Sequence, residues 1–94
     1  MLAEVPARIE KVEKKALDRE ILRMAIIAEL DAINLYEQLA ATADSESLRR
    51  VLLDVAREEK THVGEFQALL IKKDEEQKEE LERGRIEVEE ELRE

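Results

Sequence analysis

Apolar residues recur every three or four positions along most of this chain, and no segment alternates apolar and polar residues as a half-buried strand does. The pattern predicts an all-α protein with one long helix over residues 18–43 and a second over residues 45–73. Small polar residues separate the two, and Asp44 or Ser45 can cap the second helix there. Because this connection is so short, the two helices should be antiparallel neighbours in a helical hairpin.

The chain before the hairpin has no extended apolar pattern. Residues 1–17 are expected to form an N-terminal arm, with one or two helical turns after Pro6. Asp18 follows as the expected N-cap of the first long helix. With 94 residues in total, the chain has room for a single domain.

A third, very polar helix is expected over residues 74–94. Asp74 and Gln77 have the spacing of a capping box, whereas Gly84 weakens this helix in its middle. The segment holds 11 acidic and 4 basic residues, so it carries most of the net charge of −9. A helix with so few apolar residues is expected to lie mainly in solvent.

The composition excludes several classes of function. The chain has no Cys, which excludes disulfides, thiolate-held zinc or iron–sulfur sites and a thiol nucleophile. Two Gly are too few for a phosphate-binding loop, and an acidic chain with two aromatic residues is poorly suited to nucleic acid. No apolar run is long enough to cross a membrane and the N-terminus does not resemble a secretory signal, so a cytoplasmic location is expected.

The first long helix has one apolar face. At about 100° of rotation per residue, its core-forming side chains fall within about 40° of one line. These residues are Leu22, Ile26, Ile33, Tyr36 and Ala40. Glu29 falls in the centre of the same face, where an acidic side chain is out of place.

The second long helix repeats this arrangement. Its apolar line consists of Leu48, Leu52, Val55, Phe66 and Leu69. Glu59 and His62 interrupt that line and form a Glu-x-x-His pair, whose members share one face of a helix. Taken singly, a Glu can be a solvated surface residue and a His can be packed in the core. A Glu-x-x-His pair can also arise by chance in a chain rich in Glu. None of them explains polar groups on both facing apolar lines.

Together the three residues indicate a metal site. A buried carboxylate costs several kcal/mol unless it is protonated, paired or bound to metal, and neither apolar line contains Lys or Arg. Two carboxylates and an imidazole suit a divalent cation. Glu29, Glu59 and His62 are too few for two metals, but a two-fold dimer of hairpins would bring six ligands into one four-helix bundle. Such a dimer would also cover the apolar faces that one hairpin leaves in water.

The residues around the three ligands have simpler interpretations. Tyr36 and Phe66 are most simply core residues, although the Tyr36 hydroxyl could reach the groups that surround the metal. Four acidic residues lie off the apolar lines and are expected on the surface, where some could form a path for metal entry. They are Asp31, Glu37, Glu58 and Glu65.

Two segments resemble the encapsulated ferritin family, which consists of half-length ferritin-like proteins associated with encapsulin nanocompartments. They are residues 28–38, AELDAINLYEQ, and residues 54–62, DVAREEKTH. The resemblance covers about residues 18–80, and it implies that residues 1–94 form one ferritin-like domain. By this resemblance the iron ligands are Glu29, Glu59 and His62.

The resemblance also implies roles for neighbouring positions. Tyr36 matches the tyrosine that lies near the ligands in the family. Some members have an acidic residue where Ala28 stands and an aromatic residue where Leu35 stands. Iron entry in this chain would therefore rely on Asp31.

The function that the resemblance implies is a ferroxidase with two Fe per dimer, and with five dimers in a decameric ring. O₂ or peroxide would oxidise Fe²⁺ to Fe³⁺, with Glu29 and His62 as terminal ligands and Glu59 as the bridge. The expected partners are further copies of the chain and an encapsulin shell protein, with no nucleic acid and no membrane. The chain would then work in the cytoplasm, inside an encapsulin nanocompartment that stores the iron.

Two other functions stay open at this point. One is a helical interaction module, metal-stapled or metal-free, whose acidic third helix binds a partner without catalysis. The other is a peroxidase similar to rubrerythrin, but the Cys₄ iron centre that donates electrons in that family cannot form in a chain without Cys.

Overall fold

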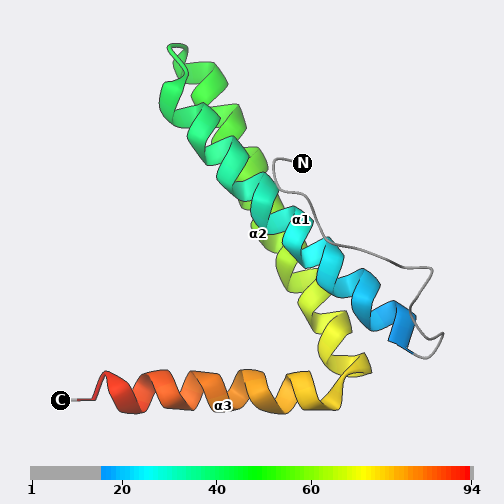
Figure 1. Cartoon of the computed structure of the whole chain (residues 1–94). Helices are drawn as coiled ribbons and strands as arrows, with labels where there is room; N and C mark the ends of the chain where they lie inside the picture. Colours follow the sequence, from blue (N-terminus) through cyan, green and yellow to red (C-terminus); the bar gives the residue numbers. More distant parts are fainter. Residues whose placement is uncertain (1–15, 94) are drawn as a thin grey trace.

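The computed structural model describes residues 16–93, and this part of the chain forms three helices and no strand. The helices are α1 (Leu17–Thr42), α2 (Glu46–Lys73) and α3 (Glu75–Glu91). α1 and α2 lie antiparallel as a hairpin, and α3 leaves the hairpin at a steep angle, so the molecule is L-shaped (Figure 1). Its extents are 47 × 46 × 19 Å, so it is also flat. The expected all-α hairpin with a third helix is confirmed, while the turns expected after Pro6 lie outside the described residues.

The two long helices begin differently. The Ser45 hydroxyl caps α2 by accepting a hydrogen bond from the Leu48 N–H at 3.3 Å, as expected. The prediction of Asp18 as the cap of α1 is wrong, because the residue at the N-cap is Ala16 and it makes no side-chain cap. Asp18 instead lies in the first turn, where a carboxylate favours the positive end of the helix dipole. It also pairs with Lys73 of α2 at 3.4 Å.

The core of the hairpin is small. Its buried apolar residues are Leu22, Ile33, Ala40, Ala56 and Leu70. Leu48 and Leu69, which the sequence places on the apolar line of α2, are 50% and 48% exposed, so they belong to the part of that line that one hairpin leaves in water. The buried residues of α2, Ala56 and Leu70, lie on average about 60° around the helix from Leu48. The apolar line of α2 therefore extends beyond the surface that α1 covers.

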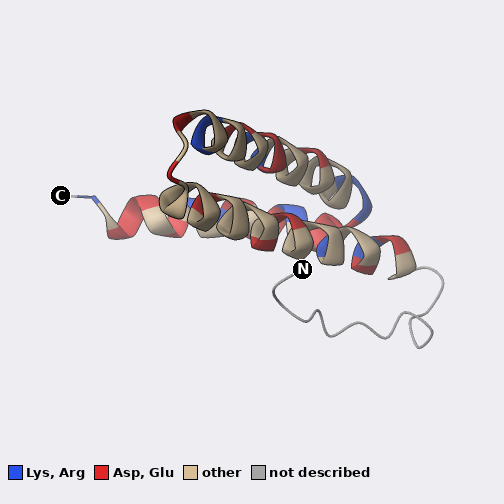
Figure 2. Cartoon of the chain, turned by 90° about the horizontal axis from the view of Figure 1, so that it is seen from above, with Lys and Arg blue, Asp and Glu red and all other residues tan. Residues whose placement is uncertain are grey.

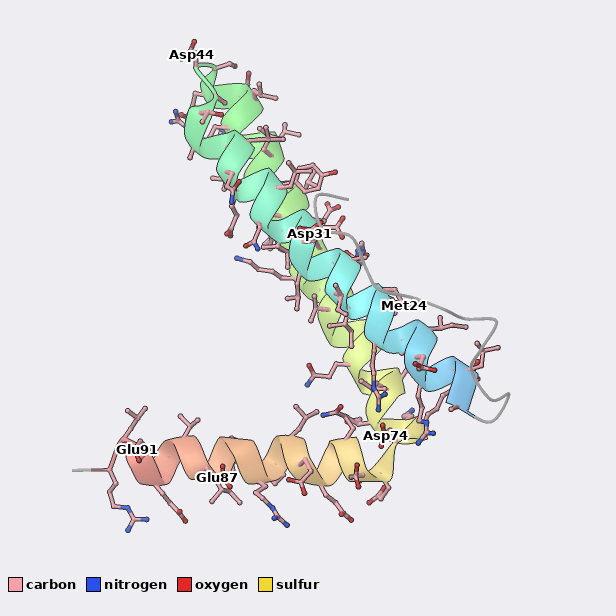
Figure 3. The ribbon with its side chains drawn as sticks, viewed as in Figure 1. Met24, Asp31, Asp44, Asp74, Glu87 and Glu91 are labelled. Carbon is pink, nitrogen blue, oxygen red and sulfur yellow. The ribbon has the colours of Figure 1, made fainter. Side chains whose placement is uncertain are left out.

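Asp74 joins the ends of all three helices at the corner of the L (Figure 3). Its carboxylate caps α3 by accepting the Gln77 N–H at 3.0 Å, as expected, and it also accepts from Arg23 of α1 at 2.6 Å. The hydrogen bond from the Gln77 backbone, followed by the contact with Arg23, holds the pKa of Asp74 below its ordinary value. Within residues 16–93, Asp74 is the one buried charged side chain, and both carboxylate oxygens have partners.

α3 runs through Gly84 without a break and, within its described residues, buries no side chain. Acidic residues cover much of its surface (Figure 2). No helix in the described part of the chain combines the length and the apolar character that crossing a membrane requires.

Candidate metal centre

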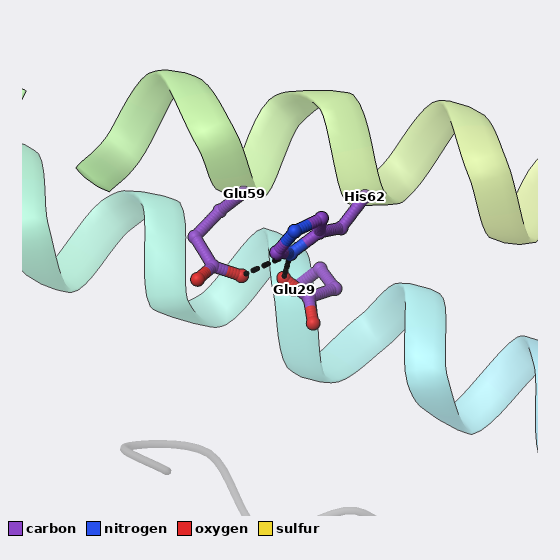
Figure 4. Close-up of side chains that lie close together, drawn as sticks. All are labelled: Glu29, Glu59 and His62. Carbon is purple, nitrogen blue, oxygen red and sulfur yellow. Dashed lines mark hydrogen bonds and ion pairs between the residues drawn. The ribbon is translucent and has the colours of Figure 1, made fainter. Parts of the chain in front are cut away.

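The three predicted ligands lie together between α1 and α2 (Figure 4). The Nδ1 atom of His62 lies 3.3 Å from a carboxylate oxygen of Glu59 and 3.4 Å from one of Glu29. One potential ligand atom from each residue falls within 4.8 Å of the other two. The hairpin therefore brings an acidic residue of α1 to a Glu-x-x-His pair on α2.

The register of the hairpin produces this meeting. Near the connection, the guanidinium of Arg49 donates to the carbonyl oxygens of Ala40 and Ala43 at 3.3 and 3.0 Å. Near the open end, Lys73 and Asp18 form their ion pair. These contacts hold α1 and α2 in one alignment at both ends, so the ligands in the middle face one another.

The electrostatics of the group fit a cation. The side chains of Glu29 and Glu59 are only 20% and 18% exposed, and among the described residues neither forms an ion pair with Lys or Arg. The nearby bases Lys60 and Arg57 pair with acidic residues outside the group. Two half-buried carboxylates that share one imidazole are a donor set suited to Fe²⁺ or a similar divalent ion.

One side of the group is open. The His62 side chain is 44% exposed, although it lies in the middle of the hairpin. We call the hairpin surface on which it opens the front face. About 100° of rotation per residue places several exposed apolar side chains on this face. They are Ile21, Leu39, Leu48, Val51 and Leu69. The described part of a single chain therefore encloses the three-residue group on one side only.

The other predicted residues lie around the group rather than in it. Tyr36 and Phe66 are part-buried, and within residues 16–93 the Tyr36 hydroxyl makes no hydrogen bond to the three ligands. Asp31 follows Glu29 by two residues on α1, which is about 200° around the helix, and stands outside the three-residue group, so its role in iron entry stays a prediction. Glu37 pairs across the hairpin with Lys60 at 3.0 Å.

Glu58 and Glu65 are exposed on α2, as expected for acidic residues off the apolar line. The structure adds no candidate ligand to the sequence-derived set within residues 16–93. What sequence reasoning missed is the cross-helix partner of Glu37, because a chain with 16 bases and 25 acids offers many pairings of similar merit.

Comparison with known proteins identifies the family of the chain. The profile of the rubrerythrin family matches residues 20–93. The chain belongs to the rubrerythrin family. Among solved structures, this rubrerythrin-family chain is similar to the encapsulated ferritin domain from Pyrococcus furiosus, at 55% identity and a TM-score of 0.81. That match covers 96% of this chain and 94% of the other, which confirms the resemblance to encapsulated ferritins.

Two longer relatives are also similar to this rubrerythrin-family chain. The "Ferritin-like-encapsulin shell fusion protein" of Pyrococcus furiosus is 66% identical over 71 residues, which are 76% of this chain and 21% of that protein. The "Encapsulin nanocompartment cargo protein EncC" of Myxococcus xanthus is 39% identical over 69 residues, which are 70% of this chain and 53% of that protein. The chain therefore spans a fifth to a half of the length of these relatives.

Proposed function

We propose that this rubrerythrin-family chain is a ferroxidase whose substrate is Fe²⁺ and whose oxidant is O₂ or peroxide. Two chains pair and contribute Glu29, Glu59 and His62 each to a shared two-iron site. The observation that carries the proposal is the convergence of three ligand atoms within 4.8 Å on the open front face. Neither carboxylate has a Lys or Arg partner among the described residues.

The ligand set accounts for the direction of the reaction. A pair of chains offers four carboxylates and two imidazoles, so four negative charges balance two divalent ions. Glu29 and His62 act as terminal ligands and Glu59 bridges the two irons. Anionic oxygen donors favour Fe³⁺ over Fe²⁺, so they assist the loss of one electron from each iron. The two irons of one site supply two electrons, which with two protons reduce one O₂ to H₂O₂, or one H₂O₂ to two waters.

The front face supports the pairing of chains. Its exposed apolar side chains lie along the same face as His62, and a two-fold partner would cover them while it completes the ligand set. By resemblance to the family, five such dimers then form a decameric ring. In the absence of metal the four carboxylates repel one another, so iron binding and association promote each other.

The relatives indicate where the reaction takes place. One is named as an encapsulin cargo protein and the other as a fusion with an encapsulin shell. We therefore place this chain in an encapsulin nanocompartment in the cytoplasm, with the shell as its partner. The ferric product passes to that compartment for storage.

The test follows ferric absorbance after Fe²⁺ is added in air. The double variant Glu29→Gln/Glu59→Gln should react no faster than buffer. Its matched control is Glu79→Gln/Glu87→Gln, which removes the same charge from exposed positions on α3 and should keep the wild-type rate within about twofold. Equal rates in the wild type and the ligand double variant would contradict the proposal.

A second function has one observation in its favour, which is that α3 buries no side chain among its described residues. On this alternative the chain is an interaction module, metal-stapled or metal-free, and α3 is its binding element. Iron that binds without yielding ferric product in the same experiment would favour this alternative.

A further inference from the structure

The side of α1 that is turned away from α2 is less exposed than its position predicts. We call this side the outer face, and its residues lie within about 35° of the line opposite the buried side chains of α1. They are Leu17, Glu20, Met24, Asp31, Leu35, Gln38 and Thr42. The first five are part-buried, whereas Gln38 and Thr42 are exposed. Cover of this face therefore begins at the start of α1 and ends before the helix does.

The other described helices do not account for this cover. α2 lies on the opposite side of α1, and Ile21 and Ile27, which are nearer to α2 around the helix, are 43% and 44% exposed. α3 leaves the corner at Asp74 and points away from the hairpin (Figures 1 and 3). A helix face without a neighbour in residues 16–93 should be the most exposed part of its helix, so the cover has to come from outside those residues.

Residues 1–15 supply a segment of matching character. Their apolar side chains recur every three or four positions, at Leu2, Val5, Ile9 and Val12. Helical turns after Pro6, as the sequence predicts, place Ile9 and Val12 within about 60° of each other. Glu10 and Lys14 then fall on the other side. Such a segment has one apolar side to bury.

The length of this segment fits the extent of the cover. Nine helical residues span about 14 Å and five extended residues about 17 Å, so residues 1–14 reach about 30 Å. At about 1.5 Å per residue, Leu35 lies about 27 Å along α1 from Leu17, and Thr42 lies about 38 Å along it. The segment therefore reaches the last part-buried residue of the outer face and not the exposed residue at its end.

The charges of the segment and of the outer face are complementary. Residues 1–15 hold four basic and three acidic residues, whereas the rest of the chain holds 12 basic and 22 acidic residues. On the outer face both charged residues, Glu20 and Asp31, are acidic. A segment of net positive charge lowers the cost of covering these carboxylates.

We propose that residues 1–15 dock on the outer face of α1 in their own chain. The segment joins α1 at its first turn and runs antiparallel to it, so Ile9 lies near Met24. Leu2 lies further along the helix, near Leu35. Asp31 lies between these two contacts and is covered by the segment. The front face stays free, so this docking goes beyond the proposed function, which needs only that face.

A pair of cysteines tests the docking directly, because the natural chain has no Cys. Full-length Ile9→Cys/Met24→Cys should form a disulfide within one chain under mild oxidation, since such a bond needs Cα atoms within about 7 Å of each other. The control is Ile9→Cys/Ala68→Cys, whose second cysteine takes an exposed position of α2 that is turned away from α1. The control should not form the bond. Peptide mass spectrometry identifies the linked positions, and electrophoresis without reductant separates bonds within a chain from bonds between chains.

The outcomes decide the proposal. A bond between positions 9 and 24 of one chain that the Ala68→Cys control lacks supports it. Bonds between two chains only would assign the outer face to a second copy and overturn the proposal. The absence of a bond, or equal bonding in the control, would overturn it as well.

A second measurement uses the thioether of Met24 as a reporter of cover. Peroxide oxidises an exposed methionine faster than a covered one, and mass spectrometry of the metal-free protein follows the sulfoxide at Met24. Ile9→Ser/Val12→Ser should raise this rate severalfold, because it removes the apolar side of the segment. The control Glu10→Ser/Lys14→Ser removes one acid and one base from the other side, and it should keep the wild-type rate. Equal rates in the wild type and in Ile9→Ser/Val12→Ser would contradict the docking.

Discussion

The hairpin and α3 are both regular helices, yet they are stabilised in different ways. The hairpin buries five apolar side chains between α1 and α2. α3 buries none among its described residues, and it depends instead on its cap and on charge pairs along its surface. Arg85 illustrates this, because it contacts Glu82 at 2.6 Å and Glu89 at 2.5 Å. The contact with Glu82 raises the pKa of Arg85 and lowers that of Glu82.

The difference shows that forming a helix and burying it are separate matters. Pairs three and four residues apart support a helix locally, but each contributes only about 0.2–0.5 kcal/mol. The hairpin gains more from packing, and it can therefore hold two carboxylates and an imidazole on a half-apolar surface. α3 lacks this gain, because it buries no side chain among its described residues.

The largest expected effect concerns the chemistry of the hairpin. His62→Ala should lower the rate of Fe²⁺ oxidation more than about 1,000-fold, or about 4 kcal/mol, because it removes a ligand. Helicity should stay the same, because the His62 side chain is 44% exposed and Ala is a good helix former. Absorbance kinetics and circular dichroism measure the two. Oxidation within twofold of wild type would show that His62 is not a ligand.

The next prediction compares packing in the two regions. Leu70→Ala removes a side chain that is only 4% exposed in the hairpin, and it should lower the free energy of unfolding by about 2–3 kcal/mol. The Ile86 side chain of α3 is already 40% exposed, so Ile86→Ala should change the free energy of unfolding by less than about 0.5 kcal/mol. Urea unfolding at one fixed protein concentration measures both. Similar losses in the two variants would mean that α3 is packed as tightly as the hairpin.

A smaller effect links the hairpin site to assembly. Zn²⁺ or Co²⁺ should strengthen pairing of the front faces about tenfold, or about 1.4 kcal/mol, since metal cancels the repulsion among the carboxylates. Glu29→Gln/Glu59→Gln should pair equally well with chelator and with metal. Size-exclusion chromatography with light scattering provides the readout. Wild-type pairing that is the same with chelator and metal would refute the coupling, even if the iron site is real.

The smallest effect concerns the corner that separates the two regions. The pKa of Asp74 is lowered in the fold, so its stabilising contribution is complete above its unfolded pKa and is lost as the pH falls through its folded pKa. Acidification should therefore lower the protection of the Gln77 amide, which Asp74 holds, when its exchange rate is compared with that of an unstructured amide at the same pH. In Asp74→Asn this pH dependence should disappear. An Asn variant that keeps it would show that another group titrates at the corner.

The sequence alone predicted the helices and the ligands because both depend on local spacing. Apolar periodicity marked α1 and α2, and the short polar break fixed them as an antiparallel pair. Glu29, Glu59 and His62 could be recognised as candidate ligands because charged or polar side chains on an apolar line are costly to bury without a partner or a metal. The caps at Ser45 and Asp74 followed from their positions at helix starts.

Only the tertiary structure decided which surfaces meet. Periodicity fixes an apolar line on a helix, but the part of that line that is buried depends on the neighbouring helix, and so Leu48 and Leu69 are exposed while Ala56 is buried. The hydrogen bond from Arg23 to Asp74 joins residues 51 positions apart, which no local pattern specifies among so many charges. That contact and the cap on the Gln77 N–H together hold Asp74 at the corner from which α3 starts.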